Sequence, residues 1–195
     1  MAEPERLFHF SEDPSIERFV PHVPATNPGQ AAGVWAIDAE HAPVYWFPRN
    51  CPRGAVWADT AEQRVVLRRL FQTAASRVQA TELDWLERIR AARLFVYAFD
   101  PAPFARWPDA DGQWVAREAV IPLDVQPAGD LLALHEQAGI ELRFVPDLLV
   151  FWESVMTSGL PFSGIRLRYA KGPRAHPRTA SPHRCGAQER MPVDA

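Results

Sequence analysis

Cysteine is scarce in this chain of 195 residues, which contains only Cys51 and Cys185. The two lie far apart in the sequence, so we expect no structural disulfide and a reducing, cytoplasmic setting. The N-terminal region has no basic stretch followed by an apolar one, so we expect no signal peptide. No apolar run approaches the roughly 18 residues that a membrane-spanning helix needs. These absences predict a soluble protein without a membrane partner.

The common catalytic motifs are missing as well. The sequence has no phosphate-binding loop of the Gly-x-x-x-x-Gly-Lys-Ser/Thr type, no Gly-x-Gly-x-x-Gly, no Gly-x-Ser-x-Gly and no paired Cys-x-x-Cys. Asp38, Glu40 and His41 lie close together, but no second histidine stands at a ligand spacing. We therefore expect no metal site, and a metal hydrolase is the least favoured enzyme class.

The composition is that of a globular protein, with 47% hydrophobic and 23% charged residues. Proline is abundant, with 19 residues, which favours short elements joined by ordered loops. The net charge of -3 gives no sign of a nucleic-acid partner. Charge is uneven, however, because residues 165–195 carry seven Lys or Arg and only two Asp or Glu. We predict a single α+β domain over residues 1–170 and a disordered basic tail rich in Pro and Arg over 171–195.

Hydrophobic patterns predict strands and helices that follow one another without a regular βαβ rhythm, which favours an α+β fold over a doubly wound one. The strands are expected at 7–10, 34–37, 55–57, 77–80, 94–99, in two pieces within 113–125, at 140–145 and at 162–169. The helices are expected near 60–72, 81–92, 130–137 and 147–156, with Thr81 as the cap of the second. A long loop rich in Pro, Asn, Gly and Ala precedes the second strand, and such loops are often functional.

His9 and Trp35 are the most interesting side chains. His9 lies in the middle of an apolar strand and, by alternation, shares a face with Leu7 and Ser11. It is either a satisfied histidine of the core or sheet edge, or a group that binds a ligand hydroxyl in a cleft. Trp35 lies in the strand after the long loop, where it either packs in the core or stacks on a ring-shaped ligand.

Arg49 and Arg53 flank Cys51 in a proline-bounded loop. Their guanidinium groups suit a forked contact with phosphate, although a solvated loop is the simpler interpretation. Two nearby cations would lower the pKa of the Cys51 thiol. Because no partner base is identifiable, a cysteine nucleophile is not favoured.

Four stretches of the sequence carry a collinear resemblance to a known family. The segment "HFS", then "VWAIDAEHAPVYW", "LFVYAFDPAPF" and "WVAREAVIPLDV" resemble, in this order, segments of small bacterial ADP-ribosyltransferases, especially rifampin ADP-ribosyltransferases. The whole chain, including "AGDLLALHEQAGIELR", also resembles a bacterial family of unknown function. The first resemblance implies an α+β fold with a split mixed or antiparallel sheet and peripheral helices.

The resemblance to ADP-ribosyltransferases also implies roles for individual residues. It implies that His9 hydrogen-bonds the nicotinamide ribose of NAD, that Trp35 stacks near nicotinamide, and that Ser11 stands at the family's Thr position. Trp35 departs from the family's Tyr, and the family's acidic residue has no clean match. Glu118 is the carboxylate expected to assist catalysis, with Asp109 and Asp111 as alternatives.

Two functions follow from these expectations. The first is an NAD-dependent ADP-ribosyltransferase-like enzyme or nucleotide-binding protein, with NAD as substrate, a small-molecule nucleotide as partner and an acceptor that is unknown. The alternative is a non-catalytic binding or interaction module on the same scaffold, which the missing acidic residue favours. Neither function requires a membrane or a specific nucleic acid.

Overall fold

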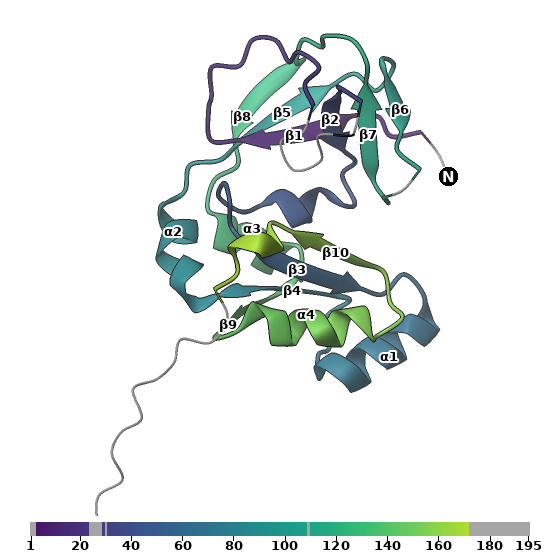
Figure 1. Ribbon diagram of the computed structural model, residues 1–195, viewed down its shortest axis with the longest axis vertical. Helices are drawn as coiled ribbons and strands as arrows, with labels where there is room; N and C mark the ends of the chain where they lie inside the picture. The colour runs from purple at the N-terminus through teal and green to yellow at the C-terminus, as the bar shows by residue number, and fades with distance from the viewer. Residues whose placement is uncertain (1–2, 24–28, 30, 109, 172–195) are drawn as a thin grey trace, which may run out of the picture.

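The computed structural model describes residues 3–23, 29, 31–108 and 110–171. Figure 1 shows two layers, with a six-stranded sheet above a four-stranded sheet. The α+β class predicted from the sequence is confirmed, with four α-helices among the described residues. None of the helices in this part of the chain is long and apolar enough to cross a membrane. The predicted disordered tail lies outside the described residues, apart from Lys171.

The upper sheet is antiparallel throughout. Its strands, in spatial order, are β6 (Phe104–Arg106), β7 (Gln113–Ala116), β2 (Val34–Ile37), β1 (Leu7–Ser11), β5 (Phe95–Phe99) and β8 (Asp124–Pro127). Aromatic and β-branched residues, which suit half-buried strands, are frequent in these segments. One face carries a buried cluster that includes Leu7, Val34, Tyr97 and Phe99, and Phe19 packs against it.

This sheet is split between β1 and β2. β1 pairs with β5 at five positions and β2 pairs with β7 at four positions, but β1 and β2 pair only at Phe8 and Ile37. Beyond that pair the two strands diverge, so the backbone groups on their facing edges need other partners.

The lower sheet has the order β10 (Phe162–Ile165), β3 (Arg53–Trp57), β4 (Arg77–Glu82) and β9 (Glu141–Val145). β9 runs parallel to β4, and the other neighbours are antiparallel. The helices α1 (Ala61–Phe71) and α4 (Leu148–Met156) cover its outer face (Figure 1). Val56, Leu67, Val78 and Leu148 lie in the apolar cluster between these helices and the sheet, and none of them is exposed.

Two glycines allow α4 to pack closely on the lower sheet. Gly54 of β3 and Gly164 of β10 are direct partners in the sheet. A Cβ atom at Gly164 would lie 2.5 Å from the ring of Trp152, and one at Gly54 would lie 3.2 Å from the same ring. The indole of Trp152 therefore occupies the space that side chains would fill at these two positions.

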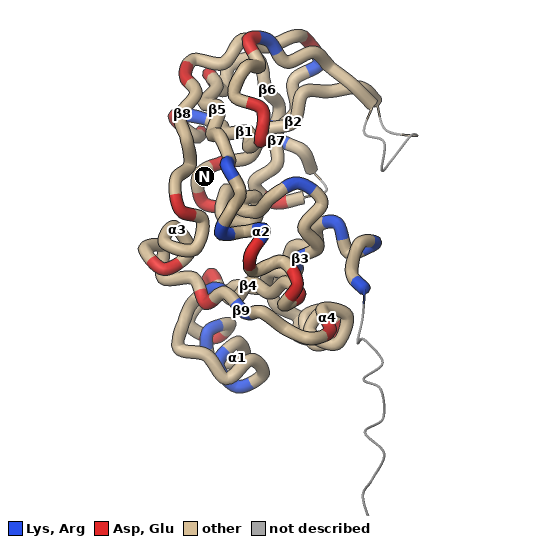
Figure 2. The backbone as a smooth tube through the Cα atoms, turned by 90° about the vertical axis from the view of Figure 1, so that its left-hand side faces the viewer, with Lys and Arg blue, Asp and Glu red and all other residues tan. Residues whose placement is uncertain are grey.

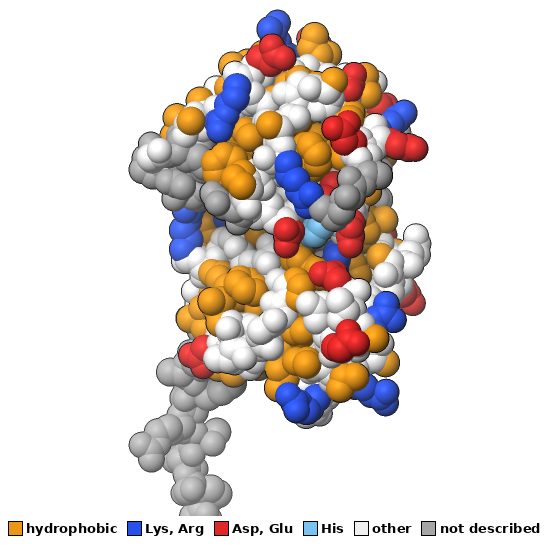
Figure 3. Space-filling model, turned by 90° about the vertical axis from the view of Figure 1, so that its right-hand side faces the viewer, with side chains coloured by type: hydrophobic (Ala, Val, Ile, Leu, Met, Phe, Trp, Pro, Cys, Tyr) orange, Lys and Arg blue, Asp and Glu red, His pale blue; other side chains and the backbone are white. Residues whose placement is uncertain are grey.

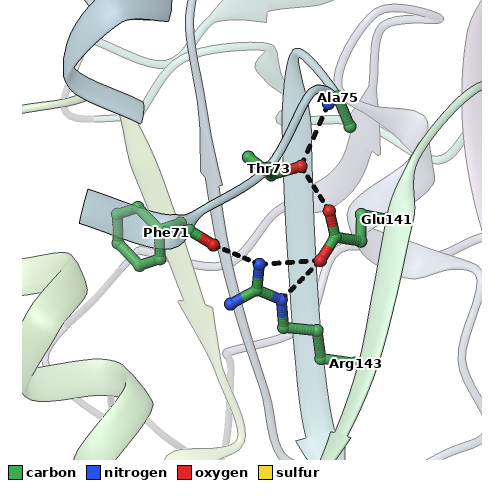
Figure 4. Close-up of polar contacts among 5 residues, drawn as sticks. All are labelled: Phe71, Thr73, Ala75, Glu141 and Arg143. Carbon is green, nitrogen blue, oxygen red and sulfur yellow. Dashed lines mark hydrogen bonds and ion pairs between the residues drawn. The ribbon is translucent and has the colours of Figure 1, made fainter. Parts of the chain in front are cut away.

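A polar network fixes β9 beside the segment that follows α1 (Figure 4). The Glu141 carboxylate accepts hydrogen bonds from the Thr73 hydroxyl and from Arg143, the latter over 2.7 Å. Arg143 also donates to the carbonyl oxygen of Phe71, and Thr73 accepts from the backbone N–H of Ala75 over 3.0 Å. These contacts connect residues about seventy positions apart and hold the one parallel strand pair in place.

Short helices occupy the space between and beside the layers (Figure 1). They are η1 (Ala42–Tyr45), η2 (Leu83–Trp85), α2 (Leu86–Ala91), α3 (Leu131–Gln137) and η3 (Leu167–Tyr169). Ile37 of β2 shares a buried cluster with Ala55 and Trp57 of β3, which joins the two layers. The helix cap predicted at Thr81 is wrong, because β4 continues through this residue and its hydroxyl donates to the carbonyl oxygen of Pro52 over 2.7 Å.

Candidate ligand-binding cavity

A cavity of about 830 Å³ lies between the two layers. Ligand pockets of proteins commonly enclose a few hundred to about 1,000 Å³, so a nucleotide-sized molecule fits this volume. The upper wall comes from β1 and β2, where the sheet splits. The lower wall comes from the segment after η1, from β3 and from the β10–η3 segment. The two walls differ in chemistry, because the arginines of the cavity lie in the lower one.

His9 lies in the upper wall, at the split. Its Nδ1 atom is 3.0 Å from the carbonyl oxygen of Trp35. A carbonyl only accepts, so Nδ1 carries the proton and Nε2 of the neutral ring is an acceptor. Burial lowers the pKa of His9, and the hydrogen bond to Trp35 opposes this shift only in part. His9 therefore presents a neutral imidazole that is able to accept a hydrogen bond from a ligand hydroxyl.

Trp35 and Ser11 line the same cavity. The half-buried indole of Trp35 packs edge-on against Trp107, with the ring centroids 5.0 Å apart, and such a fixed flat surface suits a ring-shaped ligand. The Ser11 hydroxyl oxygen accepts from the backbone N–H of Asp13 over 3.1 Å, which leaves its proton available to a ligand. All three residues for which the sequence predicts cofactor binding line the cavity. His9 and Trp35 lie on opposite faces of the upper sheet, however: pairing with Tyr97 places His9 on the face of Leu7, whereas Trp35 shares the face of Ile37, which pairs with Phe8. The binding role of the three residues stays a prediction.

Glu118, the carboxylate predicted to assist catalysis, lies outside the cavity. It is exposed in the bend after β7 and is not part of the cavity wall. The carboxylate that does line the cavity is Glu12, which accepts a hydrogen bond from the backbone N–H of Arg49 over 2.7 Å. The catalytic role predicted for Glu118 stays a prediction, and the acidic group among the described residues that line the cavity is Glu12.

Arg53 is the deepest charged group of the lower wall, with a relative exposure of 5%. Its Nε donates to the carbonyl oxygen of Val44 over 2.7 Å, and its Nη1 donates to that of Cys51 over 2.9 Å. The rings of Tyr45 and Phe47 flank the guanidinium at 5.6 and 5.1 Å. Burial lowers the pKa of Arg53 to about 10, so it remains a cation at neutral pH.

Three further arginines line the cavity nearer to solvent. Arg49 and Arg168 are exposed and Arg166 is half-buried. Among the described residues, no carboxylate forms an ion pair with these three or with Arg53. The positive charges of Arg166, Arg168 and Arg49 lower the pKa of Tyr169, after the hydrogen bond from Arg168, so all three lie near its phenol. Figure 2 shows the basic chain segments on either side of η3, just before the grey C-terminal trace.

Two lining residues adopt a backbone conformation that L-residues rarely use. Asn50 has φ +66° and Arg166 has φ +58°, both in the left-handed region. For arginine this region carries a cost of order 1 kcal/mol, which the surrounding structure must offset. Such strain is concentrated at functional sites, and here it sets the direction of the chain on the lower wall.

Cys51 does not act as a reactive thiol. Burial raises its pKa to about 11, and this outweighs the hydrogen bond between the thiol and the Thr81 hydroxyl and the charge of Arg53. The lowered pKa expected from flanking cations is wrong, because the thiol is fully buried in the cluster around Phe47.

Asp38 and His41 form a second polar site, outside the cavity wall. Nδ1 of His41 lies 2.7 Å from a carboxylate oxygen of Asp38, and that hydrogen bond raises the pKa of His41 despite its partial burial. Figure 3 shows acidic side chains and histidine together at the waist between the layers. Among the described residues, no group of three or more His, Cys, Asp or Glu has a metal-binding arrangement.

Sequence reasoning missed the contribution of η3 to the site. The strand predicted over residues 162–169 included Arg166 and Arg168, whereas β10 ends at Ile165 and the chain turns at Arg166 and returns to the cavity as η3. The concentration of Lys and Arg from residue 165 onward was the available signal. Arg49 and Arg53 both line the cavity, and the phosphate contact considered for them stays a prediction.

Comparison with known proteins gives one result. The model of a family of unknown function, DUF6886, matches residues 8–170 of the chain. No curated protein and no solved structure matches it. The match spans all strands and helices of the fold beyond Leu7, and it confirms the resemblance to a family of unknown function.

Proposed function

Because the chain belongs to the DUF6886 family, whose function is unknown, we propose a function from the cavity itself: it binds NAD and supports transfer of the ADP-ribosyl group. The observation that carries the proposal is the pairing of two unlike walls around one cavity of about 830 Å³. The upper wall has a neutral hydrogen-bond acceptor and a flat indole. The lower wall has guanidinium groups without carboxylate partners among the described residues.

Each part of NAD has a matching group in this arrangement. Nε2 of His9 accepts from a ribose hydroxyl on one face of the upper sheet, and Trp35 stacks against the nicotinamide ring on the other, with the ligand passing through the split between β1 and β2. Arg53, deepest in the lower wall, pairs with the diphosphate through N–H groups not used by Val44 and Cys51. The split between β1 and β2 agrees with the split sheet that the resemblance to ADP-ribosyltransferases implies.

The reaction requires little from the protein beyond positioning and charge. The bond between the ribose carbon and the nicotinamide nitrogen breaks, and nicotinamide leaves as a neutral ring with the bonding electrons. The acceptor nucleophile attacks the same carbon and releases its proton. The oxocarbenium-like centre formed between these events is stabilised by a nearby carboxylate, and Glu12 is the carboxylate in the cavity wall.

Calorimetric titration with NAD, ADP-ribose and nicotinamide tests the binding. We expect NAD and ADP-ribose to bind, and we expect His9→Ala and Trp35→Ala to weaken NAD at least about tenfold, the equivalent of about 1.4 kcal/mol. His41→Ala is the matched control, because it removes an imidazole outside the cavity. If none of the three compounds binds the wild-type protein, the proposal fails.

A second function, a non-catalytic nucleotide-binding module, is favoured by the exposed position of Glu118. It predicts NAD binding without release of nicotinamide. Chromatographic assay for free nicotinamide after incubation with NAD separates the two functions. Release that is lost in Glu12→Gln but kept in Glu118→Gln supports transfer with Glu12 as the assisting carboxylate, whereas loss in Glu118→Gln only supports the role predicted from the sequence.

A further inference from the structure

The lower wall carries more positive charge than NAD neutralises. In NAD, the negative diphosphate and the positive nicotinamide ring leave one net negative charge, which the buried guanidinium of Arg53 balances. Arg49, Arg166 and Arg168 remain, and Glu12 is the carboxylate that lies with them in the cavity wall. The outer part of the cavity therefore has a surplus of two positive charges when NAD occupies the inner part.

The arginines outnumber the carboxylates here, because Glu12 is the one acid among the described lining residues. Arg166 lowers the pKa of Arg53, after the larger effect of burial, and all three outer arginines act on Tyr169. Clustering of cations costs free energy through mutual repulsion, unless an anion binds among them. A binding site is the simplest reason for keeping such a cluster in a cavity wall.

The outer arginines are also oriented. The guanidinium of Arg168 lies over the ring of Tyr169, 4.8 Å from its centroid, and donates to the Tyr169 hydroxyl over 3.1 Å. Arg166 is held at φ +58° at the start of η3. Arginine supplies forked N–H donors that match the oxygens of a phosphate group.

On the basis of the proposed function, we infer that Arg49, Arg166 and Arg168 bind a phosphomonoester carried by the acceptor of the ADP-ribosyl group. A phosphomonoester has a charge of about -1.5 to -2 at neutral pH, which matches the surplus. These arginines are more exposed than Arg53, so an acceptor entering from solvent meets them after NAD has occupied the depth of the cavity. The acceptor is thus a phosphorylated compound that presents its nucleophile toward His9 and Trp35.

The test uses phenyl phosphate as the probe and titrates it into the free protein and into protein saturated with NAD. Phenol and phenyl sulfate are the neutral and singly charged controls. We expect phenyl phosphate to bind in the presence of NAD, more tightly than phenyl sulfate, with no detectable binding of phenol. Arg166→Gln and Arg168→Gln should each weaken phenyl phosphate about tenfold or more, since a hydrogen bond to a charged group contributes about 1.5–3 kcal/mol.

Arg69→Gln is the matched control, because Arg69 lies on the exposed side of α1, away from the cavity. Thermal unfolding of each variant shows whether it is folded. Competition between phenyl phosphate and NAD, or affinity that is unchanged in both cavity variants, overturns the inference. If NAD does not bind but phenyl phosphate binds through Arg166 and Arg168, the proposed function fails while the phosphate site stands.

Discussion

In the lower layer the strands pair along their lengths and α1 and α4 cover one face with an apolar cluster, whereas in the upper layer β1 and β2 separate after a single pair. The lower cluster contains Leu67 and Leu148, both fully buried and free of polar contacts. The split in the upper sheet instead places His9 against a backbone carbonyl and opens to the cavity. The outer face of the lower sheet is therefore an uninterrupted apolar core, whereas the cavity lies where the upper sheet divides, and β3 contributes side chains to both.

β3 shows how one strand serves the two purposes. Val56 of β3 is buried under α1 and α4, while Ala55 and Trp57, its neighbours, point to the other face and join the two layers. Arg53 begins the strand on the cavity side. Because side chains alternate along a strand, a single segment supplies core on one face and a cation to the cavity on the other.

The greatest change in stability should come from weakening the apolar cluster of the lower layer. Leu67→Ala removes a fully buried side chain from α1 and should lower the free energy of unfolding by about 2–5 kcal/mol, through lost burial and the cavity that remains. Urea denaturation measures this change. The affinity of the folded protein for NAD should stay within about twofold, and a tenfold loss would contradict the separation between the layers.

Arg53→Met should have the opposite result to Leu67→Ala, with a large loss of ligand affinity and a smaller change in stability. The substitution removes the deepest cation of the cavity, so the affinity for NAD and for pyrophosphate should fall about tenfold to a hundredfold. Stability should change less than in Leu67→Ala, because removal of a buried charge offsets the loss of its hydrogen bonds to Val44 and Cys51. Calorimetry and urea denaturation on the same sample give both quantities. Unchanged affinity would exclude Arg53 from the anion site.

The pH dependence of binding tests the upper wall through His9. Because burial lowers its pKa, the ring is neutral at pH 7 and takes up a proton only below about 6.5. The proton removes the acceptor at Nε2, so the affinity for NAD should fall, by up to about tenfold, as the pH decreases through the lowered pKa of His9. The unfolded chain binds this proton at higher pH than the folded protein does, so His9 also contributes stability above the unfolded pKa that is lost as the pH falls.

The pKa of His41 is shifted in the opposite direction to that of His9. Its hydrogen bond to Asp38 raises its pKa, so its contribution to stability is present at low pH and is lost as the pH rises through the folded pKa. The His9→Asn protein should lose the pH dependence of NAD binding, and the His41→Asn protein should keep it. Equal pH profiles for the wild type and His9→Asn would rule out His9 as the acceptor.

Local signals predicted much of the fold. The helices expected near residues 60–72 and 130–137 are α1 and α3, which Thr60 and Asp130 cap, and the aromatic stretch ending at Phe99 is an inner strand of the upper sheet. The prediction at Thr81 was wrong because a tertiary hydrogen bond to Pro52 and pairing with β3 and β9 outweigh the local capping preference. The short strand β6 was missed because its identity depends on pairing with β7 rather than on its own sequence.

The sequence pointed to residues of both walls, His9 and Trp35 on the upper one and Arg49 and Arg53 on the lower one, but not to Arg166 and Arg168. His9 and Trp35 stand out in the sequence because a polar ring and an indole interrupt apolar strands near a long loop. No local pattern singles out Arg166 and Arg168. Their place in the cavity wall depends on the turn at Arg166, which brings η3 to the same wall as Arg53 of β3, more than one hundred residues earlier in the chain. Glu118 illustrates the same limit, since no local pattern tells which charged residue after a strand faces a cavity.

A smaller effect is expected at the start of α1, which covers the outer face of the lower sheet, away from the cavity. The Thr60 hydroxyl accepts from the backbone N–H of Gln63 over 3.2 Å, and the Gln63 side chain accepts from the backbone N–H of Thr60 over 3.2 Å. Thr60→Ala removes half of this capping box and should lower the free energy of unfolding by about 1 kcal/mol, whereas Thr60→Ser should retain most of it. Urea denaturation resolves the difference, and NAD titration of both variants should give the wild-type affinity. A change in affinity in Thr60→Ala would mean that α1 transmits strain through β3 to Arg53, and that the two layers are less independent than their separate clusters indicate.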